Sequence, residues 1–290
     1  MFFDDVEVDS FALAITKSKY HPVNISTIID TQTHLSVEDR NTLSVMLSKH
    51  TTSFDGILKV YPHRLVHLDV IQNATPRHLC AYPVAHIHLD VFKAELLRLC
   101  KIGVLEICGA SQWASPTFII PKKNDSVRWV SDFRELNKVI QHCICPLPRI
   151  QDILKHRPGY SFFSKLDVSM QYFTFELDPE SQKVCVISTP FGLYKYKRLP
   201  MGIKQSSNIA QEVMENLFRD LDDVKIYIVN IGYFSSTNST HIQTLDVILT
   251  CLEQNGFTVN PSKCEWAVKE TDWLGYWLSP TGLKPWSKKD

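Results

Sequence analysis

Two short segments of this 290-residue chain could together form a metal-binding site. The first is a predicted strand with an acidic residue, and the second is a predicted β-hairpin. Residues 161–168 form a predicted strand that carries Asp167 near its end, and residues 225–228 and 231–234 form two predicted strands around Val229-Asn230. Nucleotidyl transfer uses two divalent ions about 3.5–4 Å apart, held by carboxylates that converge from separate strands. Asp167 supplies one such ligand. The hairpin has the shape of the second half of the site, but its tip has no carboxylate.

A local group of basic residues lies upstream of these strands. Residues 122–149 contain Lys122, Lys123, Arg128, Arg134, Lys138 and Arg149, opposed by Asp125, Asp132 and Glu135. Lysine offers a point charge and arginine a bidentate fork for phosphate, so this group suits a phosphate-bearing ligand. A solvated hairpin tip would carry the same residues. The whole chain has 31 basic and 31 acidic residues, and this neutrality argues weakly against nucleic-acid binding.

The predicted elements mix helices and strands. We expect helices over residues 36–48, 92–100, 206–220 and 240–255, and strands over residues 117–121, 127–130, 161–168, 173–177 and 195–199, besides the hairpin. Ser36, Ser206 and Thr240 are the predicted helix caps, and Gly256 ends the last helix. Helices and strands in this order predict an α+β sheet with helices on one face.

A series of motifs runs through these elements in a fixed order. Ser111-Gln112-Trp113-Ala114-Ser115-Pro116, Pro121-Lys122-Lys123 and the stretch from Arg128 to Lys138 resemble the fingers of Gypsy-type LTR-retrotransposon reverse transcriptases. The family's later motifs are matched by Pro146-Leu147-Pro148-Arg149-Ile150, Lys165-Leu166-Asp167, Leu199-Pro200-Met201-Gly202, Asn260-Pro261-Ser262-Lys263-Cys264 and Trp273-Leu274-Gly275-Tyr276. The resemblance covers residues 76–285, and chance does not explain so many motifs in one order.

The resemblance implies a right-hand polymerase fold of α+β class, in which helices back an antiparallel palm sheet. Residues 76–160 would form the fingers, and residues 161–285 the palm, including a primer-grip-like hairpin. Residues 1–75 would be an N-terminal helical lead-in of unclear role. No Asp-Thr/Ser-Gly protease motif precedes the fingers, and we expect a truncated thumb and no RNase H domain.

The resemblance also implies roles for single residues. The residues that would contact the incoming deoxynucleotide triphosphate are Lys122, Lys123 and Arg128, and Tyr172 would select deoxyribose. Met201, Gly202 and Gln211 would line the nucleotide pocket and template path, and Trp273, Leu274 and Gly275 would form the primer grip. Without the family, Tyr172, Met201, Gly202 and Gln211 would each be interpreted as structural. Mg²⁺ is the metal that the resemblance implies for the ancestral enzyme, and Asp167 would be its remaining ligand.

The chain departs from the family at the hairpin. The family's tip reads Tyr-x-Asp-Asp, whereas this chain has Tyr227-Ile228-Val229-Asn230. Valine offers no donor or acceptor, and asparagine offers a neutral carbonyl oxygen. The nearest acids are Asp222 and Asp223, and Asp223 would lie roughly 20 Å from position 229 along an extended strand. We therefore expect a pseudoenzyme that retains the reverse transcriptase fold, with weak affinity for an RNA or DNA primer–template.

Composition limits the other classes of protein. The eight cysteines form no CxxC pair, which favours structural thiols over a zinc site. No run approaches the ~20 apolar residues that span a bilayer, and the acidic N-terminus is unlike a secretory signal, so we expect an intracellular protein of the cytoplasm or nucleus. Three alternatives stay open: a nucleic-acid-binding remnant, a translated remnant without a role, and an active element misrepresented by a sequence or gene-model error at positions 229 and 230.

Overall fold

The computed structural model describes residues 24–121, 127–141, 147–154 and 159–286. These residues divide into two compact units. Unit 1 is built from Val66–Gln141 and Leu177–Ile203, and unit 2 from Tyr20–Leu65, His142–Glu176 and Lys204–Asp290. Both units are assembled from segments that are distant in sequence. The contiguous fingers and palm limits expected from the motifs stay a prediction.

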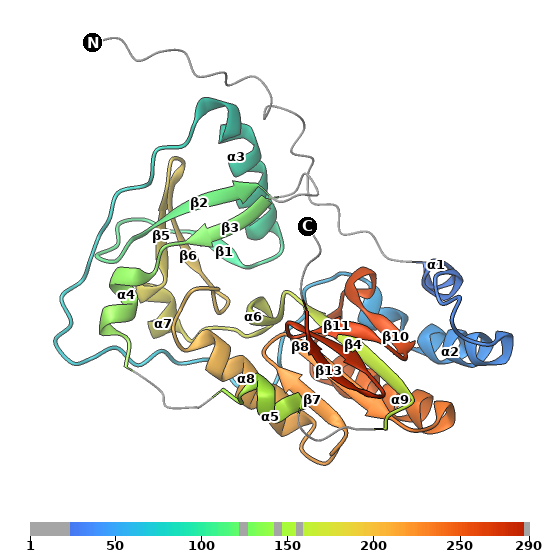
Figure 1. Cartoon of the computed structure of the whole chain (residues 1–290). Helices are drawn as coiled ribbons and strands as arrows, with labels where there is room; N and C mark the ends of the chain where they lie inside the picture. Colours follow the sequence, from blue (N-terminus) through green and yellow to red (C-terminus); the bar gives the residue numbers. More distant parts are fainter. Residues whose placement is uncertain (1–23, 122–126, 142–146, 155–158, 287–290) are drawn as a thin grey trace, which may run out of the picture. The chain divides into compact units, whose positions relative to one another are not determined.

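Unit 1 is centred on a five-stranded sheet with the order β1-β6-β5-β2-β3 (Figure 1). Its strands are β1 (Leu105–Ile107), β2 (Ser115–Pro121), β3 (Val127–Ser131), β5 (Val186–Thr189) and β6 (Gly192–Tyr196). The β2–β5 pair is parallel and the other pairs are antiparallel. The helices of the unit are α3 (His86–Lys101), α4 (Arg134–Val139) and α7 (Pro179–Val184). Phe92, Leu96 and Leu99 form the buried stripe of α3, at the spacing of one helix face.

Unit 2 contains an antiparallel sheet with the order β10-β4-β8-β7 (Figure 1). A further short strand, β9, pairs with β4. The strands are β4 (Phe162–Ser169), β7 (Val224–Tyr227), β8 (Asn230–Ser235), β9 (Thr258–Val259) and β10 (Glu265–Val268). Its helices are α5 (Ile150–Leu154), α6 (Gln171–Thr174), α8 (Ser206–Leu217), α9 (Asn238–Gln254) and the 3₁₀ turn η2 (Pro261–Lys263). Because α8 contacts β7 and α9 contacts β8, the predicted antiparallel sheet backed by helices is confirmed.

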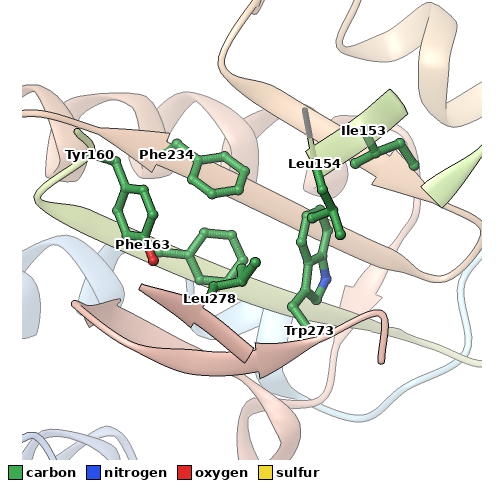
Figure 2. Close-up of a cluster of buried hydrophobic side chains, with 7 residues drawn as sticks. All are labelled: Ile153, Leu154, Tyr160, Phe163, Phe234, Trp273 and Leu278. Carbon is green, nitrogen blue, oxygen red and sulfur yellow. The ribbon is translucent and has the colours of Figure 1, made fainter. Parts of the chain in front are cut away.

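A second sheet of unit 2 packs on the first through aromatic side chains. It consists of β11 (Thr271–Trp273), β12 (Tyr276–Ser279) and β13 (Gly282–Pro285). Figure 2 shows Trp273 and Leu278 of this sheet lying against Phe163 of β4 and Phe234 of β8. Gly232 of β8 makes the close approach possible, since a Cβ atom there would lie 2.4 Å from Cζ2 of Trp273. Burying an aromatic residue of this size contributes a large share of the packing energy.

The expected lead-in is divided between the two units, because residues 66–75 belong to unit 1 and the described residues 24–65 belong to unit 2. The unit 2 part contains α1 (Ile25–Asp30), α2 (Val37–Lys49) and the 3₁₀ turn η1 (Thr51–Phe54). The ring nitrogens of His50 lie 3.0 Å from carboxylate oxygens of Asp246 and Glu253 on α9. Leu43 and Leu47 of α2 are fully buried. The lead-in helices therefore help to build the core of this unit.

Three local predictions were wrong. Residues 173–177 were expected to form a strand, but Met170 adopts a left-handed conformation and α6 follows it. A pattern of alternating polarity over only five residues fits a strand, but it also fits a short helix that is followed by extended residues. Thr237, and not Thr240, caps α9, because its hydroxyl accepts from the backbone N–H of Thr240. The predicted cap Ser206 lies inside α8, whose N-cap is Gln205.

Candidate active site

Three strands place the predicted active-site positions together at one end of the unit 2 sheet. In the antiparallel register, Asn230 lies opposite Tyr227 of β7 and opposite Asp167 of β4. Ile228 and Val229 form the turn between β7 and β8. The backbone N–H of Val168 donates to the carbonyl oxygen of Val229 over 3.1 Å. The hairpin tip and Asp167 are therefore neighbours, as the motif order predicts.

The turn is held from behind by Gln211 of α8. This side chain is fully buried, and its Oε1 accepts from the backbone N–H of Ile228 over 2.6 Å. Its Nε2 donates to the carbonyl oxygen of Ile226 over 3.1 Å and to Glu215 over 2.7 Å. Ile228 has φ of 56°, a left-handed conformation that a β-branched residue adopts only under constraint. Gln211 thus acts as a latch on the hairpin, and its predicted place in the nucleotide pocket stays a prediction.

Asp167 has a basic partner. Nζ of Lys263 lies 3.1 Å from Oδ1 of Asp167, and the two side chains are 61% and 21% exposed. The backbone N–H of Asn260 donates to the carbonyl oxygen of Asp167 over 2.9 Å. Asp167 therefore makes two contacts with the segment that carries Lys263, one through its backbone carbonyl group and one through its carboxylate.

The donors at this end of the sheet do not fit a two-metal centre. Asp167 offers one carboxylate, Asn230 offers a neutral amide oxygen and Val229 offers nothing. Asp223 directly precedes β7, at the end where Val224 pairs with Tyr233 and opposite to the tip. Across the described ranges, no three His, Cys, Asp or Glu side chains are grouped to hold a metal ion. Magnesium requires several hard oxygen ligands, and these residues supply one charged group.

Tyr172 lies on α6, just after β4. Its hydroxyl oxygen is 3.3 Å from Oγ of Ser207 on α8, and burial raises the pKa of the phenol above its ordinary value. The preceding residue, Gln171, is 1% exposed, and neither of its amide atoms has a hydrogen-bond partner among the described residues. The role of Tyr172 in sugar selection stays a prediction.

The predicted primer grip forms a tight hairpin. Leu274 and Gly275 have φ of 51° and 83° and join β11 to β12, and positive φ at both residues is typical of a type I′ turn. Trp273 is only 3% exposed and points into the aromatic cluster of Figure 2. The turn residues, and not the indole ring, are the part of this hairpin that a nucleic acid could contact. That contact stays a prediction.

The remaining predicted residues belong to unit 1 or lie outside the described residues. Lys122 and Lys123 are outside them. Arg128 is exposed on β3, in register with Ile120 of β2. Met201 is 52% exposed, and the carbonyl oxygen of Gly202 accepts from Nδ2 of Asn137 over 2.8 Å.

Sequence reasoning missed a hollow in unit 1. Its volume is about 700 Å³, and Tyr82, Phe118, Asp132, Arg134 and Gly202 are among the residues that line it. The Arg134 guanidinium group donates two hydrogen bonds to the Asp132 carboxylate, and the backbone N–H of Arg134 donates a third over 3.2 Å. The Tyr82 hydroxyl donates a fourth over 2.7 Å. The Arg134 guanidinium group holds the pKa of the Asp132 carboxyl far below its usual range. The Asp132-Phe133-Arg134 motif was a signal for this feature, but its contact with Tyr82 was not visible in the sequence.

Comparison with known proteins points to one family. The family model described as reverse transcriptase (RNA-dependent DNA polymerase) matches residues 120–278. The chain is 26% identical over 261 residues to the retrovirus-related Pol polyprotein from transposon 297 of Drosophila melanogaster, covering 87% of this chain and 25% of the relative. It is 28% identical over 212 residues to the retrovirus-related Pol polyprotein from transposon gypsy of the same organism, covering 70% of this chain and 20% of the relative.

The fold is similar to that of a solved viral enzyme. The foamy viral protease-reverse transcriptase in complex with an RNA/DNA hybrid superposes with a TM-score of 0.83 at 20% identity, covering 91% of this chain and 36% of that chain. The chain spans a quarter or less of the length of the curated relatives named above.

Within the described residues, no helix is long and apolar enough to cross a membrane.

Proposed function

This chain belongs to the reverse transcriptase (RNA-dependent DNA polymerase) family and is a domain of retrotransposon origin, and we propose that it does not catalyse polymerisation. One observation carries the proposal. The strand register sets Asn230 opposite Asp167, with Val229 beside them, so a single carboxylate stands where two metal ions would need several. Mg²⁺ would supply charge stabilisation to the transferred phosphoryl group if it bound, but the ligands at these positions do not support that binding.

The size of the defect follows from electrostatics. Loss of one positioned charge or donor removes about 3–4 kcal/mol of transition-state stabilisation. Each 1.36 kcal/mol corresponds to about tenfold in rate. Two missing carboxylates therefore suppress turnover by several orders of magnitude, and the latch by Gln211 keeps the backbone of the hairpin in place without restoring the charge.

Primer extension tests the proposal directly. Purified protein is incubated with deoxynucleotides, an RNA template, a DNA primer and either Mg²⁺ or Mn²⁺. We expect incorporation no higher than that of Asp167→Ala, because neither protein holds the ions. Incorporation that depends on Asp167 would refute the proposal. The double substitution Val229→Asp and Asn230→Asp shows whether the rest of the protein can support the reaction once the carboxylates return. Resequencing the locus separates true loss from an error at these two positions.

A second candidate function is binding of a primer–template without catalysis. The fold matches an enzyme solved with an RNA/DNA hybrid, and Arg128 presents an exposed guanidinium group on β3. A phosphate-binding protein loses affinity steeply as salt rises. Filter binding between about 50 and 200 mM salt, with Arg128→Ala as the comparison, therefore tests this candidate. If the protein does not bind the primer–template at the lowest salt concentration, this candidate function is excluded.

A further inference from the structure

The lysine partner of Asp167 is fixed by its own segment. β9 pairs with the end of β4, where Val168 lies opposite Val259. The next residue, Asn260, caps η2 with its side chain and bonds to the carbonyl oxygen of Asp167 through its backbone N–H. Lys263 is the last residue of this 3₁₀ turn. The segment thus places the Cα atom of Lys263 near Asp167 through a short turn that is anchored to β4 on its N-terminal side, so the backbone is already ordered when the ion pair forms.

Two other carboxylates of unit 2, those of Glu265 and Asp272, have a separate partner. Lys165 lies two residues before Asp167 on β4, and its Nζ is 2.7 Å from Oε1 of Glu265 and 3.7 Å from Oδ1 of Asp272. Glu265 and Asp272 are therefore engaged by a different lysine. Lys263 is the cation that meets Asp167 among the described residues, and Asn230 across the strand is neutral.

We propose that the Lys263 ammonium group takes the place of a metal ion as the counter-charge of Asp167, so that this site is folded and neutral without divalent ions. The inference rests on the proposed loss of catalysis, since an active enzyme would need Asp167 for metal. A monovalent internal cation suits a site with one carboxylate, because a divalent ion would remain under-neutralised and would give up hydration for few ligands. Asp167 then serves in an ion pair that stabilises the β4–η2 contact.

A double-mutant cycle on unfolding tests the ion pair. Asp167→Asn and Lys263→Gln keep the size of each side chain while removing its charge, and urea unfolding of both single variants and the double variant gives the coupling. We expect a coupling of about 2- to 5-fold in the unfolding equilibrium constant, the range of a well-placed, partly exposed pair, and it should shrink in high salt. The matched control is Glu180→Gln with Lys183→Gln, an ion pair on α7 with both side chains about two-thirds exposed, which should show less coupling.

Metal binding is measured on the same proteins by Mn²⁺ electron paramagnetic resonance, without nucleotides or template. Wild type and Asp167→Asn should bind Mn²⁺ equally weakly, and Mg²⁺ or EDTA should leave the unfolding midpoint unchanged at constant ionic strength. Additive effects of the two substitutions would overturn the inference, and so would a wild-type Mn²⁺ site that disappears in Asp167→Asn. Primer extension separately reports failure of the proposed function, because these two measurements do not depend on catalysis.

Discussion

The contact between Gly232 and Trp273 gives a sharp prediction about what holds the primer-grip-like hairpin. A Cβ atom at position 232 would lie 2.4, 2.5 and 3.0 Å from three ring atoms of Trp273. Carbon atoms in contact prefer about 3.5–4.0 Å, so Gly232→Ala forces the indole ring or the strand to move by about 1 Å. The ring centroids of Phe163 and Phe234 lie 5.3 and 6.0 Å from that of Trp273, and Trp273 is 3% exposed, so a shift of the ring disturbs a packed aromatic cluster.

The magnitude is the difference between two effects. Overpacking a buried site costs about 1–3 kcal/mol. Gly232 does not have positive φ, so alanine fits the backbone and gains about 0.4–1 kcal/mol by restricting the unfolded chain. The difference spans about 0–2.6 kcal/mol, and the upper half of that range, about 1.3–2.6 kcal/mol of net destabilisation, is expected because the added Cβ would lie only 2.4 Å from the ring.

Urea unfolding followed by circular dichroism measures this loss as a lower midpoint at an unchanged slope. Gly109→Ala is the matched control, because a Cβ atom there meets nothing within 4 Å, and it should not lower the midpoint. Trp273→Leu should be destabilising alone, yet Gly232→Ala should cost less in that background, because the clashing ring is gone. If Gly232→Ala is as stable as wild type, or if the two substitutions are additive, the packing argument fails.

Three further predictions concern other buried groups. His241 lies between Ser164 and Ser235, and burial lowers its pKa from 6.5 to about 3. The buried neutral imidazole therefore contributes its full stabilisation above pH 6.5. As the pH falls from 6.5 toward 3, protonation of the unfolded chain lowers the free energy of unfolding by about 1.4 kcal/mol per pH unit. Urea midpoints at pH 7 and pH 5 should therefore differ more in wild type than in His241→Gln, and equal differences would contradict this. Gln211→Ala should cost about 1–3 kcal/mol in urea unfolding, since the partly buried N–H of Ile228 loses its acceptor. Gly256→Ala should cost more than Gly232→Ala in the same assay, because Gly256 has φ of 74° and its added Cβ would lie 2.1 Å from a backbone oxygen.

The sequence was sufficient for features with strong local signals. The strand that ends near Asp167, the hairpin around Val229-Asn230 and the Ser36 cap of α2 all occur where the patterns place them. Motif order predicts that positions 167 and 230 lie together, and the strand register confirms their proximity. These successes come from short-range periodicity and from motifs that span whole elements.

Local sequence patterns could not predict the contacts between residues that are distant in sequence. Nothing near Gln211 in sequence indicates that its amide binds the backbone of Ile228, 17 residues away. The Lys263 contact with Asp167 spans 96 residues and depends on the pairing of β9 with β4. The α9 cap was misplaced because Thr237 and Thr240 both suit a cap, and only tertiary context selects between them.

The geometry of the hairpin does not depend on the side chains at its tip. Its backbone is fixed by pairing with β4, by the Gln211 latch on Ile228 and by the packing of Trp273 over Gly232. None of these contacts uses a side chain at position 229 or 230, so the same backbone shape could carry either carboxylates or the neutral side chains of Val229 and Asn230. Removal of like charges from one end of a sheet also relieves repulsion when no metal is bound. Val229→Asp with Asn230→Asp should therefore lower stability in the absence of divalent ions, even as it restores ligands for them.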